Sequence, residues 1–158
     1  MLQFELTPQQ KELQTKVREF AIKEILPAVW YYDEKGEIPL FLLQKAFEAG
    51  FMNTNIPIKY GGKGFGLIEN VILTEEISAT CPGMATSIFD NSLGMAPIIL
   101  SDHEKLKEKY LSLITREFKR ICFATSEPTM GSDVAGMRCL AEKKRGRLYF
   151  KRNKVLDY

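Results

Sequence analysis

A chain of 158 residues, 45% of them hydrophobic, is within the size of one domain and can fill a core. No stretch approaches the roughly 20 consecutive apolar residues of a membrane-spanning helix, so we expect no membrane span. The net charge is only +2, which excludes neither acidic nor basic partners. The segment Met1 to Lys11 lacks the basic start and apolar centre of a signal peptide, so we expect a cytoplasmic protein, or a mitochondrial-matrix protein if it is processed in a eukaryote.

The charge is unevenly placed. From Arg138 onward there are eight basic side chains against two acidic ones. Such an excess would suit nucleic acid or an acidic partner, but KKRGR at 143–147 has the form of a charged turn between two strands. We predict the turn, and no nucleic acid among the partners.

Cysteine and histidine are sparse. Cys81, Cys122 and Cys139 are odd in number and include no C-x-x-C pair, which indicates free thiols rather than a disulfide framework or a zinc site. His103 is the only histidine, which excludes paired-histidine metal motifs, and we expect it in the exposed first turn of a helix. We predict no metal site.

Two amphipathic helices are predicted at the start. The TPQQ stretch at 7–10 has the form of a capping box with proline at the first helical position, and Pro27 is expected to end the helix. A second helix runs from Pro39 to Gly50, whose freedom at positive φ suits a C-terminal cap. We expect the two helices to form an antiparallel pair.

The segment from Asn55 to Gly66 (NIPIKYGGKGFG) contains four glycines, too many for a helix or a central strand. Its Gly-Gly-x-Gly order invites a phosphate-loop interpretation. Lys63 lies among the glycines, however, and no hydrophobic strand precedes them. We therefore predict a packing loop.

A third helix is predicted from Leu67 to near Cys81, with Glu75 and Glu76 on its polar face. The residues expected to pack are Ile68, Val71 and Ile72.

Two more helices follow. Met84–Leu100 is almost uncharged, so we expect a central helix buried on nearly all sides, which Pro97 would kink or shorten. A capped helix opens at Ser101. Its expected buried line is Leu106, Tyr110 and Leu113.

Composition changes after these helices. Alternating residues predict short strands at 119–124, 137–142 and 148–150 around a polar loop. The predicted fold class is mainly α with a C-terminal β segment: a helical domain at 1–117, and the beginning of a β domain at 118–158.

The polar loop lies in the stretch from Phe123 to Gly136, FATSEPTMGSDVAG. Gly131 would let backbone approach a ligand without a Cβ in the way, and Ser132 offers a hydroxyl beside N–H groups. Alternatively, Ser126 and Asp133 hydrogen-bond their own backbone in an ordinary turn, which composition alone favours. The loop holds no nucleophile paired with a base.

The order of residues in this loop resembles the signature of the acyl-CoA dehydrogenases. Thr125 departs from it, because an aliphatic residue is usual there, and so does Met130, because a very small residue is usual and a bulky one would narrow the flavin approach. A second resemblance is the family's Pro-x-x-Tyr-Gly-Gly-x-Gly stretch between early helices. The matching residues are Ala124, Ser126, Glu127, Gly131, Ser132, Asp133 and Gly136, and, in the second stretch, Pro57, Tyr60, Gly61, Gly62 and Gly64.

The resemblance implies a cofactor and a substrate. In the family this loop lies against FAD, and a helix with an Asn-Ser-Leu-Gly stretch, matched at 91–94, borders the acyl pocket. The residues implied to contact FAD are Phe123, Ala124, Thr125, Ser126, Gly131 and Ser132. Those implied to contact acyl-CoA are Ser132, Ala85, Phe89 and Leu93, although the last three are equally ordinary core residues.

The resemblance covers only the N-terminal helical domain and the opening of the β domain of a longer family. The family's general base lies in a C-terminal helical domain, so no catalytic residue is assigned here, and Glu127 is not promoted to that role. Residues 156–158 stand where the family presents Trp-Ile-Thr to the flavin. We expect weak or absent FAD binding by the isolated chain.

The implied function is α,β-dehydrogenation of acyl-CoA thioesters, of the fatty-acid β-oxidation type, by the N-terminal portion of an FAD-dependent enzyme that is inactive as this isolated chain. Implied partners are an electron-transferring flavoprotein and either a missing C-terminal half or further copies of the chain. The alternative is a non-catalytic helical interaction protein that retains the scaffold. A nucleic-acid-binding domain using the basic tail is a distant third hypothesis.

Overall fold

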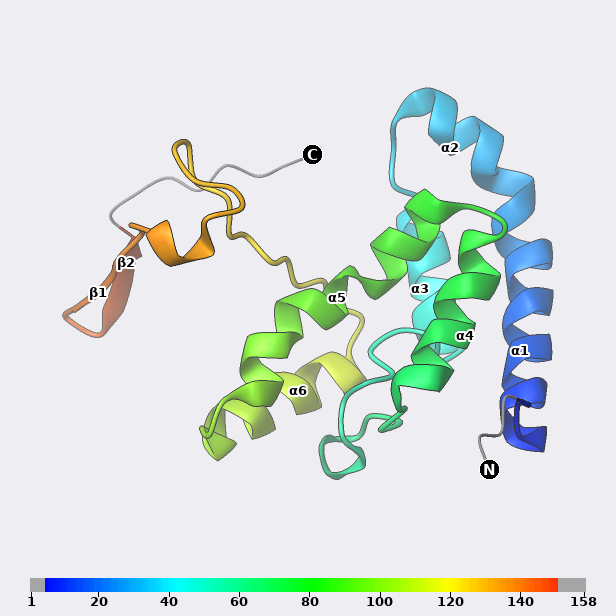
Figure 1. Cartoon of the computed structure of the whole chain (residues 1–158), viewed down its shortest axis with the longest axis horizontal. Helices are drawn as coiled ribbons and strands as arrows, with labels where there is room; N and C mark the ends of the chain where they lie inside the picture. The colour runs from blue at the N-terminus through cyan, green and yellow to red at the C-terminus, as the bar shows by residue number, and fades with distance from the viewer. Residues whose placement is uncertain (1–4, 151–158) are drawn as a thin grey trace. The chain divides into compact units, whose positions relative to one another are not determined.

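The computed structural model describes residues 5–150, which form two compact units that divide after Ile121. The first unit is helical and the second contains a small hairpin, so the fold is mainly α with a C-terminal β segment, as predicted (Figure 1). Helices of the first unit are α1 (Pro8–Phe20), α2 (Val29–Lys35), α3 (Leu40–Glu48), α4 (Leu67–Ser78), α5 (Pro82–Leu100) and α6 (Glu104–Arg116). No helix in residues 5–150 has the length and hydrophobicity needed to cross a membrane.

The start of α1 is confirmed and its predicted end is wrong. Thr7 Oγ1 accepts from Gln10 N at 3.2 Å while the Gln10 side chain accepts from Thr7 N at 2.9 Å, which completes the capping box. The helical path continues past Pro27 through a π-helical turn (Ala21–Ile25) and a 3-10 turn (Leu26–Ala28) into α2. Pro27 is tolerated because it lies in the first positions of the 3-10 turn, where its missing N–H costs little.

Glycines end α2 and α3. Gly36 closes α2 in the left-handed region at φ 63°, and its N–H donates to Asp33 O. Gly50, at φ 73°, follows α3 as predicted, and the Phe51 N–H after it donates to Ala46 O at 2.8 Å. Both ends use the positive φ that glycine adopts without steric cost.

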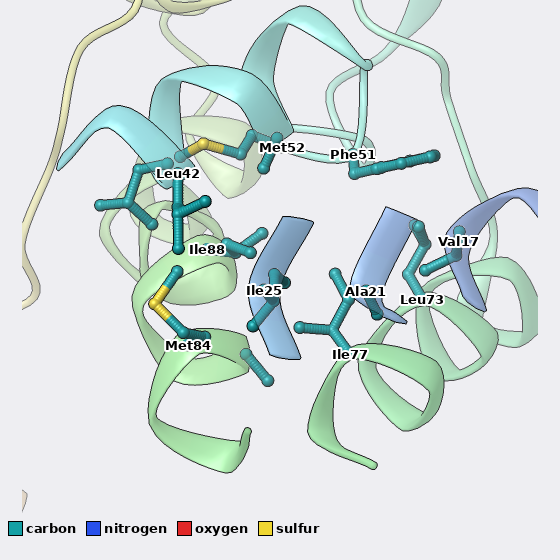
Figure 2. Close-up of a cluster of buried hydrophobic side chains, with 13 residues drawn as sticks. Val17, Ala21, Ile25, Leu42, Phe51, Met52, Leu73, Ile77, Met84 and Ile88 are labelled. Carbon is teal, nitrogen blue, oxygen red and sulfur yellow. The ribbon is translucent and has the colours of Figure 1, made fainter. Parts of the chain in front are cut away.

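The expected antiparallel pair of the first two helices is wrong. α1 packs along α4, and α3 packs against α5 (Figure 1). Figure 2 shows why: Val17 and Ala21, on the run that starts with α1, meet Leu73 and Ile77 of α4 in one buried cluster. The other buried members are Ile25, Leu42, Leu43, Ala46, Phe51, Met52, Met84, Ala85 and Ile88.

The helix face that α4 buries differs from the predicted one. Ile68 and Val71 are about half exposed, at 51% and 50%, while Leu73 and Ile77 are fully buried. Ile72 is buried as predicted. Glu76, expected on the polar face, is only 5% exposed because it meets Arg18 of α1.

Arg18 and Glu76 form a two-pronged ion pair between α1 and α4. Arg18 Nε donates to Glu76 Oε2 and Arg18 Nη2 to Glu76 Oε1, both at 2.7 Å. Hydrogen bonding to this guanidinium lowers the pKa of the Glu76 carboxyl below its ordinary 4.5. The charge of Glu76 is therefore favoured by folding.

Glu76 should make the unfolding free energy depend on pH. A carboxyl whose pKa is lower in the folded than in the unfolded state stabilises the fold fully above about pH 4.5, and this contribution is lost as the pH falls through the folded value. We expect Arg18→Ala to remove the contribution of Glu76 to this acid dependence, measured by urea unfolding at pH values above and below 4.5. Lys16→Ala, which breaks the exposed Lys16–Glu12 pair, is the control and should keep it. An unchanged pH profile in Arg18→Ala would contradict the assignment.

α5 and α6 differ from prediction in detail. α5 passes through Pro97 without a break. Leu93 and Leu100 of α5 are 58% and 82% exposed, so this helix is not buried on all sides as predicted. α6 begins after His103, which is exposed as predicted, but no side-chain cap forms there. Leu106 and Tyr110 are more than a third exposed and Leu113 is half-buried, whereas the fully buried residues of α6 are Leu111 and Ile114.

The 55–66 segment is a packing loop, with one 3-10 turn at Ile58–Tyr60. Tyr60 and Ile56 belong to a second buried cluster with Met95, Leu111 and Ile114. Gly62 lies so close to Ile56 that a Cβ would overlap its carbonyl oxygen. The glycines therefore allow close backbone packing here.

In its described part, up to Phe150, the second unit contains one hairpin, in which β1 (Ala141–Lys144) and β2 (Arg147–Phe150) pair antiparallel. Arg145 and Gly146 turn it at φ 48° and 77°, so the charged turn between two strands is confirmed. The predicted strand at 119–124 is absent from the described residues, and 137–140 is irregular. No disulfide joins Cys81, Cys122 and Cys139, in agreement with the prediction.

Candidate functional site

The polar loop opens with a tight turn. Glu127 N donates to Met130 O at 2.9 Å and Met130 N donates to Glu127 O at 3.0 Å, which closes a two-residue turn over Pro128 and Thr129. Met130, the bulky departure from the family pattern, is buried at 7% exposure. Its side chain is therefore withdrawn from solvent.

Glu127 is a structural carboxylate. It is 6% exposed, and its two oxygens accept from Cys139 N at 2.8 Å and Arg138 N at 3.0 Å. These bonds engage N–H groups of the predicted 137–142 strand, which explains why 137–140 is irregular. A carboxylate held by two main-chain donors joins the loop to the segment that follows it.

Asp133 is also engaged with its own backbone. Its Oδ1 accepts from Gly136 N at 3.1 Å and caps the 3-10 turn Val134–Gly136. A Cβ on Gly136 would collide with Asp133 Oδ2, so a side chain at that position would make the Asp133 carboxylate shift. The ordinary-turn interpretation is thus correct for Asp133.

Three of the residues expected to contact FAD are exposed: Phe123, Gly131 and Ser132. Within the described chain, the main-chain N–H groups of Gly131 and Ser132 donate to no protein acceptor. Gly131 does not adopt a positive φ, and a Cβ there would meet nothing within 4 Å. Ala124, Thr125 and Ser126 are half-buried. Free N–H donors beside a serine hydroxyl fit the polar edge of a flavin, so this donor set is compatible with FAD.

The three residues expected near an acyl chain are spread over different surroundings on α5. Ala85 is 2% exposed in the main buried cluster, Phe89 packs against that cluster, and Leu93 is 58% exposed. The core interpretation therefore holds for Ala85. Residues 156–158 lie outside the described residues.

The first unit also has an apolar cavity of about 220 Å³ between the α1–α2 run, α3 and the start of α5. Its lining includes Ile25, Val29, Leu42 and Met84, and none of the residues expected to contact acyl-CoA.

Sequence reasoning missed a buried pair of amides, Asn53 and Asn91. They are 5% and 2% exposed and hydrogen-bonded to each other at 3.0 Å. The signal was present, because Asn91 is a polar residue in the almost uncharged stretch of α5. It was read only as part of the Asn-Ser-Leu-Gly match.

Comparison with known proteins supports the resemblance. Residues 7–126 match the family described as acyl-CoA dehydrogenase, N-terminal domain. The probable medium-chain specific acyl-CoA dehydrogenase 2, mitochondrial, of Caenorhabditis briggsae is 36% identical over 143 residues, which are 90% of this chain and 35% of that protein.

Two solved structures show the same fold. Butyryl-CoA dehydrogenase from Megasphaera elsdenii has a TM-score of 0.84 and 27% identity, over 94% of this chain and 40% of that one. An acyl-CoA dehydrogenase from Bacillus anthracis complexed with FAD has a TM-score of 0.79 and 28% identity, over 89% of this chain and 24% of that one.

The chain therefore spans only about a third of the length of its curated nematode relative and well under half of these structures. The match extends over most of the chain, and it ends at Ser126, within the loop that begins the second unit. The chain belongs to the acyl-CoA dehydrogenase family, as its N-terminal helical domain.

Proposed function

We propose that this chain is the N-terminal portion of an FAD-dependent acyl-CoA dehydrogenase that oxidises the α,β bond of acyl-CoA thioesters. The observation that carries the proposal is the match of residues 7–126 to a flavin-dependent family, up to the start of a loop with free N–H donors. When bound, FAD would supply the acceptor for the β hydride, which carries both electrons of the oxidation.

The chain's own residues would bind and orient. Phe123 to Ser126, together with Gly131 and Ser132, are proposed to hold the cofactor, with the main-chain N–H groups of the last two donating to it. Ser132 is proposed to help place the thioester, and Phe89 and Leu93 to border the acyl chain with Ala85 beneath them. Orientation of this kind lowers the barrier by holding reacting groups in place.

We propose an electron-transferring flavoprotein as the redox partner and further protein, either additional domains or a second copy, as the structural partner. We also propose the cytoplasm as the location, or the mitochondrial matrix, since the nematode relative is named as mitochondrial.

The 158-residue chain alone should not turn over acyl-CoA. The two carboxylates of the loop, Glu127 and Asp133, are both engaged by main-chain N–H groups, so neither is available to remove the α proton. A dye-reduction assay with butyryl-CoA and added FAD should give the rate of the protein-free control. A rate that rises with the concentration of the chain would contradict this prediction.

Gly131→Val should sharply weaken FAD binding while leaving the fold intact. The position has a negative φ and open space around it, so a branched side chain costs the free chain little, yet it would stand where backbone must approach the ligand. Ser132→Ala should weaken binding only roughly 2- to 12-fold, the equivalent of one hydrogen bond. Flavin-fluorescence titration, alone and with the remaining domains of a family member supplied separately, measures both.

The control for this pair is Leu148→Ala, an exposed change on β2 that should leave FAD binding unchanged. Circular dichroism should stay helical in all three variants, because the helices end at Arg116. Equal FAD affinity in wild type and Gly131→Val would show that the loop is an ordinary turn.

An alternative is a non-catalytic interaction protein. It is favoured by exposed apolar residues along the α1–α2 run, where Ile22, Leu26 and Trp30 are 53%, 49% and 85% exposed. An absorption spectrum of the chain combined with the remaining domains of a family member and FAD, after removal of unbound FAD, separates the two, because bound oxidised flavin is yellow and an interaction module is colourless.

A further inference from the structure

The buried amide of Asn91 makes three hydrogen bonds to two different parts of the first unit, the loop after α3 and residues 119–121. Its Nδ2 donates to Asn53 Oδ1 at 3.0 Å and to Lys119 O at 2.9 Å. Its Oδ1 accepts from Ile121 N at 2.9 Å. With two donors and one acceptor engaged, the amide of Asn91 is used on both sides, which fixes its orientation.

Asn53 links Asn91 to α6 through hydrogen bonds. Its own Nδ2 donates to Ile114 O at 3.1 Å, near the end of α6. Asn53 has φ 58°, in the left-handed region that asparagine adopts more readily than most residues. The backbone conformation and the side chain of Asn53 thus both belong to this arrangement, which links α5, α6, the loop after α3 and residues 119–121.

Residues 119–121 have no helix or strand to hold them. The described hydrogen bonds to their main chain come from Asn91, which replaces the ladder of the strand predicted at 119–124. The chain continues directly from Ile121 into Phe123–Ser126. The last described main-chain hydrogen bonds before that run are therefore made to one side chain of α5, while the Ile121 side chain packs against the second buried cluster.

We propose that Asn91 is a positioning residue: by clamping Lys119 and Ile121 to α5, it sets where the flavin-contacting run Phe123–Ser126 begins. This inference rests on the proposed function. Helix α5 carries the proposed acyl-contacting residues Phe89 and Leu93. In this proposal Asn91 connects α5 to the main chain that leads to the cofactor loop. Asn91 itself touches neither ligand in this proposal.

The test replaces Asn91 by leucine, which has similar volume and no hydrogen-bonding group. Three polar groups, Asn53 Oδ1, Lys119 O and Ile121 N, then lose their partner. Amide hydrogen exchange of the 158-residue chain should accelerate at Ile121 and its neighbours by roughly tenfold, while α1 and α4 exchange as in wild type. FAD affinity, measured by flavin fluorescence with the remaining domains of a family member supplied, should fall by a similar factor.

Two further variants separate positioning from general stability. Asn53→Gly keeps the left-handed backbone and Asn91's bonds to Lys119 and Ile121, so both effects should be intermediate. Leu73→Ala opens a cavity in the first buried cluster, which does not include residues 119–121, and should lower thermal stability more than Asn91→Leu while leaving FAD affinity unchanged. FAD affinity should therefore follow the protection of Ile121 and not the melting temperature.

The outcomes are distinct. Unchanged exchange at Ile121 in Asn91→Leu, or equal acceleration throughout the helices, overturns the clamp. Faster local exchange with FAD affinity equal to wild type overturns the positioning role and leaves the proposed function standing. Absence of FAD binding by the wild-type chain, even with the remaining family domains supplied, overturns the proposed function and with it the flavin half of this inference.

Discussion

Gly62→Ala is expected to destabilise the helical unit by about 3 kcal/mol, because the new methyl group has no space. A Cβ at Gly62 would overlap Ile56 O and lie 2.5 Å from Ile56 Cβ. Ile56 cannot move aside easily, since its side chain is fully buried and its carbonyl accepts from Gly64 N at 2.9 Å. Urea unfolding followed by far-UV circular dichroism measures the loss.

Gly83→Ala is the matched control. Gly83 lies in the first turn of α5 with negative φ, and the nearest atom to a Cβ there is Cys81 Sγ at 3.9 Å, an ordinary contact. Alanine should be neutral or stabilising by up to about 1 kcal/mol, since it is the better helix former. If Gly62→Ala and Gly83→Ala unfold at the same urea concentration, Gly62 does not lie as close to Ile56 as described here.

Leu73→Ala is expected to cost about 3 kcal/mol, within the usual range for a buried leucine. Leu73 is fully buried in the cluster that joins α4 to the run beginning with α1 (Figure 2). The substitution removes three carbon atoms and leaves a cavity that rigid neighbours fill only in part. The shift in the midpoint of urea unfolding, at constant slope, reports the change.

Val71→Ala, an exposed truncation on the same helix, is the control for Leu73→Ala. Val71 is 50% exposed, so its truncation should change the free energy of unfolding by less than about 0.5 kcal/mol. This pair also tests which face of α4 is buried, because the apolar spacing alone suggested Val71. A larger loss for Val71→Ala than for Leu73→Ala would reverse the assignment.

The assignment of the loop to a cofactor rests on the order of its residues and stays a prediction. The structure adds that the main-chain N–H groups of Gly131 and Ser132 donate to no protein acceptor within the described chain. The engagement of Glu127 by Arg138 and Cys139 was not predicted, because it joins residues 11 and 12 positions apart. The roles of Asn53 and Asn91 were also missed, since each depends on partners from distant parts of the chain.

The sequence by itself determined the features that depend on residues within a few positions of each other. The capping box at Thr7, the glycine after α3 and the charged turn at Arg145-Gly146 are of this kind, because the groups that form them are already neighbours in the chain. The overall order, helices followed by a small β segment, follows from the same local patterns.

Only the tertiary structure decided which helices pair and which polar groups are buried. Helix α1 packs against α4, and Glu76 is buried against Arg18. Residues 119–121 hydrogen-bond to Asn91 instead of forming a strand. Each outcome brings together segments about 30 to 60 positions apart, where burial of apolar surface outweighs local preference. The spacing of apolar residues indicates that a segment can form an amphipathic helix. Which face of that helix is buried depends on the element that packs against it.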